Sequence, residues 1–138
     1  RYTDHVLERI YSYAKQKLNL QSMIYFSDHG GIPDMRRSPR FLGFKMVRIP
    51  LWTYLSDEYR KQHADIADAL TANSDRYFTN DLVYELVCGI LDVQSNRYNQ
   101  AQSIASTSYK YKRNELLTYD GRIRIEDDDL DTNPKTMQ

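Results

Sequence analysis

The sequence has a single cysteine, no long apolar run and no excess of either charge. Cys88 therefore cannot form a disulfide within the chain, and its apolar neighbours predict a buried thiol. No apolar run approaches the roughly 20 residues that a membrane-spanning helix needs. Lys and Arg number 19 together, as do Asp and Glu, so no overall field favours nucleic acid or an anionic membrane. We expect neither a nucleic-acid partner nor a membrane span in this segment.

What is present is a mixture of helix and strand patterns. Apolar residues recur at three- and four-residue steps over residues 4–18, which predicts an amphipathic helix. A continuous apolar run at residues 22–27 is typical of a strand buried on both faces of a parallel sheet. A second strand is predicted at residues 45–54, and it is either an edge strand or an interrupted one because Pro50 cannot donate a backbone hydrogen bond. This order predicts the α/β fold class.

The second half of the chain continues this alternation. Helices are predicted over residues 56–72 and 82–91, the latter capped by the Thr-Asn-Asp sequence at residues 79–81. Two apolar segments flank Asp120-Gly121 and predict a small β-hairpin, because Asp-Gly tolerates the positive φ angles of a type I′ turn. Residues 1–125 are predicted to belong to one domain, and the acidic, polar residues 126–138 to form a disordered tail.

A possible chemical site stands at the end of the first predicted strand. Ser27 is followed there by Asp28, His29 and two glycines, which allow the chain to turn sharply. In open α/β sheets, ligands bind outside the carboxyl ends of the strands. A carboxylate and an imidazole suit Zn²⁺ or Mn²⁺. The alternative interpretation is that Asp28 caps a turn and His29 is a surface histidine.

The loop after this strand end carries a basic cluster. Residues 28–44 have no periodicity, and loops of this length within a compact domain are usually functional or mobile. Arg36, Arg37 and Arg40 lie within it. Arginines there could bind an anionic substrate by bidentate pairing, and the alternative is that they are solvated loop charges.

The strand end at residues 23–30 resembles the metal-binding strand end of the alkaline phosphatase superfamily. Within that superfamily the chain is most similar to the sulfatase-like branch, and there to the phosphoethanolamine transferases that modify lipopolysaccharide. Further similar segments, in order along the chain, are residues 2–7, 47–52, 78–82 and 89–91. The resemblance implies a C-terminal fragment of an alkaline-phosphatase-like α/β/α sandwich, followed by the small hairpin.

The resemblance also implies a metal and a reaction. By match of motif, Asp28 and His29 would be ligands of Zn²⁺, with Mn²⁺ or Ca²⁺ as alternatives. In that family a Thr, Ser or modified Cys attacks a phosphate or sulfate ester, free or lipid-linked, and a divalent metal lowers the pKa of this nucleophile. The nucleophile is expected upstream of the present chain, so no catalytic residue is assigned within it. We expect the chain to lack activity without the N-terminal part of its own catalytic domain.

The same resemblance implies a location and leaves alternatives open. The chain starts at Arg1 rather than Met, so we expect a piece of a longer protein. The resemblance implies that an upstream anchor holds this protein on the periplasmic side of the bacterial inner membrane. Two features depart from the family pattern: Gly31 stands where the family commonly has Glu, and the following loop lacks a histidine. The alternatives are a sulfatase or phosphodiesterase, and a non-catalytic α/β binding or scaffolding module with a vestigial metal site.

Overall fold

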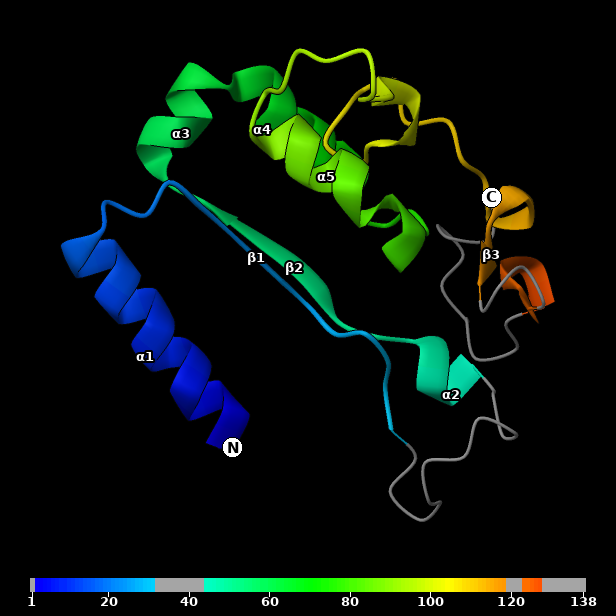
Figure 1. Ribbon diagram of the computed structural model, residues 1–138, viewed down its shortest axis with the longest axis horizontal. Helices are drawn as coiled ribbons and strands as arrows, with labels where there is room; N and C mark the ends of the chain where they lie inside the picture. The colour runs from blue at the N-terminus through cyan, green and yellow to red at the C-terminus, as the bar shows by residue number, and fades with distance from the viewer. Residues whose placement is uncertain (1, 32–43, 119–122, 128–138) are drawn as a thin grey trace.

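The computed structural model describes residues 2–31, 44–118 and 123–127 (Figure 1). A two-stranded ribbon runs through the middle of the view, made of β1 (Ser22–Phe26) and β2 (Leu51–Leu55). Helix α1 (Tyr2–Lys17) lies on one side of this ribbon. The helices α3 (Asp57–Gln62), α4 (Ala64–Ala72) and α5 (Val83–Ile90) lie on the other. The fold is therefore mixed α/β.

The strand at residues 22–26 forms as predicted, but the prediction of a parallel sheet is wrong. β1 pairs with β2 in antiparallel register, from Ser22 opposite Leu55 to Phe26 opposite Leu51. Parallel neighbours need a crossover connection of a dozen or more residues, usually a helix, to return the chain to the same end. The only helix described between β1 and β2 is α2 (Phe44–Val47), a single turn. The continuous apolar run arises because both faces of β1 are covered. Ile24 packs on the main core, whereas Met23 lies opposite Tyr54, whose ring contacts Tyr11 of α1.

The second predicted strand, at residues 45–54, is half wrong. Its first residues form α2, closed by the N–H of Arg48 donating to the carbonyl of Phe44 at 2.8 Å. The strand begins only after Pro50. Proline has no N–H to donate to a neighbouring strand, so it is tolerated just before the first paired residue. Gly30 donates its N–H to the carbonyl of Met46 at 2.6 Å, so α2 is held beside the end of β1.

The helix predicted over residues 56–72 is broken into α3 and α4. Its start is confirmed: Ser56 caps α3 by accepting a hydrogen bond from the N–H of Tyr59 at 3.0 Å. The break is at His63, whose φ of −127° and ψ of 57° are not helical. The His63 ring packs on the Tyr59 ring at a centroid distance of 4.6 Å, so the kink is covered by an aromatic contact.

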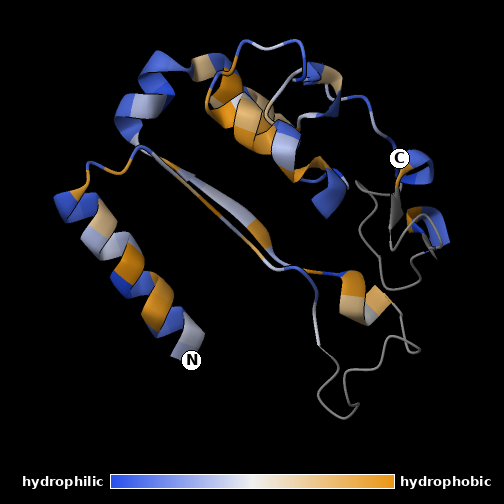
Figure 2. Ribbon diagram, viewed as in Figure 1, coloured by the Kyte–Doolittle hydropathy of each residue, from blue (hydrophilic) through white to orange (hydrophobic). Residues whose placement is uncertain are grey.

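The helix predicted over residues 82–91 is confirmed and is preceded by a 3₁₀ turn, η1 (Asn80–Leu82). It supplies the centre of the main core, and Figure 2 shows apolar residues concentrated on α4 and α5. Cys88 is buried there, as predicted. The core residues, drawn from β2, α3, α4, η1, α5 and the chain after them, are Leu55, Tyr59, Ile66, Ala67, Leu82, Leu86, Ile90, Ile104, Ala105, Tyr109, Leu116 and Ile125.

The polar segment after α5 is held by side chains rather than by a ladder. The buried Asn73 amide, at the end of α4, donates to the carbonyls of Ile104 and Ser106. Arg76 donates to the carbonyl of Tyr109, and its other guanidinium nitrogen to that of residue 111. Apart from a 3₁₀ turn, η2 (Gln100–Gln102), this segment lacks regular structure up to residue 112.

The predicted hairpin pairs as expected. A 3₁₀ turn, η3 (Arg113–Glu115), leads into β3 (Leu117–Thr118), which is antiparallel to β4 (Ile123–Arg124). A last 3₁₀ turn, η4, covers Ile125–Asp127. The predicted Asp-Gly turn at residues 120–121 and the tail from residue 128 lie outside the described residues.

Helix α1 forms as predicted but contributes no buried residue. Its contact with the ribbon includes Tyr11, whose ring meets that of Tyr54 edge-on at a centroid distance of 5.0 Å. Ile10 and Tyr13 on the same helix are more than half exposed, as is Leu18 just after it. No helix in the described part of the chain is long and apolar enough to cross a membrane.

Candidate functional site

The candidate site is the turn that follows β1. Asp28 and His29 are exposed there, with the Asp28 side chain 85% and the His29 side chain 42% accessible. Oδ2 of Asp28 lies 3.5 Å from Nε2 of His29. The structure therefore brings the two predicted metal ligands together at the carboxyl end of the strand, where the sequence places them.

Each of the two side chains has its other polar atom occupied by the backbone. Oδ1 of Asp28 accepts the backbone N–H of His29 at 2.9 Å, which leaves Oδ2 facing the imidazole. Nδ1 of His29 lies 2.7 Å from the carbonyl oxygen of Gly30. Because that oxygen only accepts, Nδ1 carries the proton in this contact, and in the neutral ring the lone pair is then on Nε2. Metal-binding histidines commonly use such a carbonyl to fix their tautomer.

The turn itself is fixed from three directions. The Ser27 hydroxyl donates to the carbonyl of His29 at 2.7 Å across the turn. The N–H of Gly30 is bonded to Met46 of α2. From the start of η1, Nδ2 of Asn80 donates to the carbonyls of Ser27 at 3.0 Å and Asp28 at 3.3 Å. The site is thus exposed at its side chains and anchored at its backbone.

The spacing of the two facing atoms suits a metal ion. Two ligands about 2.0–2.1 Å from a tetrahedral Zn²⁺ are roughly 3.3–3.4 Å apart, close to the 3.5 Å between Asp28 and His29. An imidazole nitrogen favours Zn²⁺ over Ca²⁺, which prefers oxygen ligands throughout. The donor pair therefore fits half of a zinc coordination shell. Within residues 2–31, 44–118 and 123–127, no group of three or more His, Cys, Asp or Glu side chains could hold a metal ion.

The electrostatics favour an ionised carboxylate. The His29 backbone N–H, which donates to the Asp28 carboxylate, holds the pKa of Asp28 below its usual range, and the His29 ring lowers it further when that ring is protonated. The carboxyl group is therefore deprotonated throughout the neutral range, as a metal ligand has to be.

A second histidine–aspartate contact elsewhere in the fold shows what an ordinary pair looks like. His63 Nδ1 lies 3.9 Å from Oδ2 of Asp92. The His63 ring is packed on Tyr59, and Asp92 sits after α5 with a φ of 50°. This contact joins two helix ends that are far apart in the sequence, whereas Asp28 and His29 share one turn.

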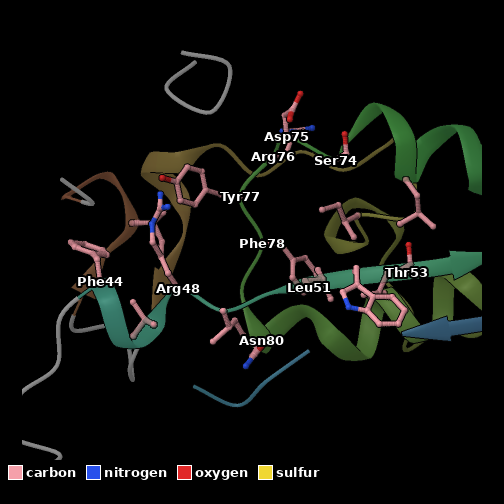
Figure 3. Close-up of a pocket in the computed structure, with 17 residues that line it drawn as sticks. Phe44, Arg48, Leu51, Thr53, Ser74, Asp75, Arg76, Tyr77, Phe78 and Asn80 are labelled. Carbon is pink, nitrogen blue, oxygen red and sulfur yellow. The ribbon is translucent and has the colours of Figure 1, made fainter. Parts of the chain in front are cut away.

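A cavity of about 770 Å³ lies beside the site, lined by residues of α2, β2 and the chain between α4 and η1 (Figure 3). Its volume is within the range of small-molecule pockets, and most of its walls are apolar. Helix α2 and Asn80 contribute both to its lining and to the anchoring of the turn after β1. The guanidinium of Arg76 also lines it but is bonded to backbone carbonyls, so it is not an open anion site.

The predicted substrate-binding arginines, Arg36, Arg37 and Arg40, lie outside the described residues. Sequence reasoning missed the part played by Asn80. The Thr-Asn-Asp sequence at residues 79–81 predicts a helix cap, and Thr79 is the N-cap residue of η1 but makes no side-chain capping hydrogen bond. The Asn80 amide instead donates to the backbone at the end of β1. The one sequence signal for such a role is that Asn80 directly follows the cap residue Thr79.

Comparison with family models, with curated proteins and with solved structures gave no match. The resemblance to the sulfatase-like branch therefore stays a prediction from the sequence motifs. The geometry of the turn after β1 is the structural observation that bears on function.

Proposed function

We propose that the chain is the C-terminal part of a metal-dependent transferase of the sulfatase-like branch, and that it moves phosphoethanolamine to a lipopolysaccharide or glycan acceptor. The observation that carries the proposal is the facing pair of Oδ2 of Asp28 and Nε2 of His29, 3.5 Å apart at the end of β1. The motif resemblance at residues 23–30 supports the choice of family.

In this proposal Asp28 and His29 hold a divalent cation, zinc by preference, with the rest of its ligands supplied from outside the described residues. The bound metal supplies Lewis-acid stabilisation of charge and activation of a nucleophile. The chain's own residues set up the ligands: Gly30 fixes the His29 tautomer through its carbonyl, and the His29 N–H orients the Asp28 carboxylate. The exposed turn leaves both ligands open to a substrate ester.

The proposed setting is the periplasmic side of the bacterial inner membrane, with an upstream membrane anchor and with the nucleophile contributed by an N-terminal part of the same catalytic domain. The donor is a phosphate ester, lipid-linked or free. The chain by itself is expected to show negligible transferase, phosphatase or sulfatase turnover, because two metal ligands without a nucleophile do not make this reaction possible.

The test uses the protein that carries this chain, expressed in bacteria, with lipopolysaccharide and lipid-linked glycans analysed by mass spectrometry. We expect the wild type to add phosphoethanolamine to its acceptor. Asp28→Asn and His29→Ala should lose this addition, and Asp92→Asn should retain it. Asp92→Asn is a matched control, because Asn tolerates the positive φ of that position. Ester hydrolysis without transfer, lost in the same two variants, would replace the transferase by the sulfatase or phosphodiesterase alternative. Activity that is unchanged in both variants would overturn the proposal.

A further inference from the structure

The strand end that carries the two ligands is tied to the rest of the fold by one side chain from far along the sequence. Asn80 lies at the start of η1, 52 residues after Asp28. Its Nδ2 donates to the carbonyls of Ser27 and Asp28, at 3.0 and 3.3 Å. Both partners only accept, so the amide nitrogen rather than its oxygen must face them.

These two carbonyls belong to the peptide groups on either side of the Asp28 Cα. An amide that bonds both carbonyls restricts rotation of the two peptide planes about that Cα. The direction of the Asp28 Cα–Cβ bond is thereby set, since Cβ is fixed relative to the two planes. Oδ1 can then accept the His29 N–H at 2.9 Å while Oδ2 faces His29 Nε2.

The opposite side of the turn is anchored independently. The N–H of Gly30 is bonded to Met46 of α2, and the carbonyl of the same glycine accepts the Nδ1 proton of His29. The imidazole is therefore positioned from α2, whereas the carboxylate is positioned from η1. Loss of the Asn80 amide frees the carboxylate and leaves the imidazole anchor in place.

We propose that Asn80 is a positioning residue for the Asp28–His29 pair, which holds the carboxylate in the orientation that a divalent cation needs. The metal is that of the proposed function, and the inference rests on it to that extent. Outer-shell partners of metal ligands are commonly worth 10- to 100-fold in metal affinity. Asn80 bonds the backbone carbonyls of Ser27 and Asp28 rather than the Asp28 carboxylate itself, and these bonds are solvent-exposed. We therefore expect Asn80→Ala to lower the zinc affinity about 10-fold.

The first measurement is calorimetric titration of the 138-residue chain with Zn²⁺ alone. Asn80→Ala and Asn80→Asp are compared with wild type, and Asn96→Ala, an exposed turn asparagine away from the site, is the matched control. Asn80→Asp keeps the shape of the side chain but replaces the donor by a carboxylate, so it is expected to lose at least as much affinity. Asn96→Ala is expected to bind zinc as wild type does. Equal zinc affinity in wild type and both Asn80 variants would overturn the inference.

The second measurement needs no metal. NMR three-bond couplings report the Asp28 side-chain rotamer, and hydrogen exchange reports protection of the His29 N–H. We expect one rotamer and a protected N–H in wild type, and rotamer averaging with faster exchange in the Asn80 variants, at an unchanged melting temperature. A single retained rotamer in a folded Asn80 variant would overturn the inference. Absence of zinc binding in wild type, with the rotamer still dependent on Asn80, would overturn the proposed metal function and keep the positioning role.

Discussion

Gly89 in α5 is the position where one added methyl group gives the sharpest test of the described packing. An ideal Cβ there would lie 2.5 Å from the Ser103 hydroxyl oxygen, 3.0 Å from the Ala105 Cβ and 3.0 Å from the Tyr98 hydroxyl oxygen. Ser103 is fully buried, and its oxygen accepts the N–H of Ala105 at 3.3 Å. The hydroxyl therefore cannot move away without giving up that hydrogen bond.

Two opposing effects set the magnitude for Gly89→Ala. Alanine in place of glycine within a helix stabilises by about 1 kcal/mol. Overpacking of a close-packed core costs about 1–3 kcal/mol, and three close contacts favour the upper half of that range. The expected net loss in the free energy of unfolding is therefore about 1–2 kcal/mol, or a fall of roughly 4–8 °C in Tm.

The assay is urea unfolding followed by circular dichroism. Gly31→Ala is the control, since nothing lies within 4 Å of the Cβ that it adds, and a change within about 0.5 kcal/mol is expected. In a Ser103→Ala background the shortest contact is absent, so the cost of Gly89→Ala should fall by about 1 kcal/mol in a double-mutant cycle. A neutral or stabilising Gly89→Ala would refute the described packing of α5 on residues 98–105.

Two further predictions concern the side chains that hold the segment after α5. Asn73→Ala should lower the free energy of unfolding by about 2–3 kcal/mol, because it leaves two carbonyls without their buried donor. Urea unfolding against Asn96→Ala checks this, and a loss below about 0.5 kcal/mol would contradict it. Burial raises the pKa of Tyr109 well above its usual value, so the folded chain keeps this phenol proton after the unfolded chain releases it. Stability is therefore complete below about pH 10 and falls as the pH rises further, and Tyr109→Phe should make that fall shallower. An equal slope in both proteins above pH 10 would contradict the burial of the phenol.

The elements that the sequence predicts correctly are those whose signal is local. Residues 83–90 repeat apolar side chains at helical spacing, and Ser56 precedes acidic residues in a first turn, so α5 and the start of α3 are readable from the chain. The direction of β1 is different, because an apolar run is the same for a parallel and an antiparallel neighbour. Only the position of β2, which the short α2 returns beside β1, decides between them.

The candidate site likewise has one part that the sequence predicts and one part that it does not. Asp28 and His29 are adjacent in sequence and followed by glycine, so their proximity at a strand end could be predicted from the chain. The Asn80 bonds join residues more than 50 positions apart and exist only because η1 packs against the end of β1. A short polar side chain of this kind carries no sequence signal beyond its compatibility with a helix start.

The central claim is that Asp28 and His29 together bind a divalent cation, and calorimetric titration of the chain with Zn²⁺ tests it most directly. The account predicts weak binding of one zinc ion by the wild type, lost in Asp28→Asn and in His29→Ala. His5→Ala, which removes an exposed histidine of α1, and Asp92→Asn should bind as the wild type does. Absence of zinc binding in the wild type, or binding that survives both substitutions at the turn after β1, would contradict the account.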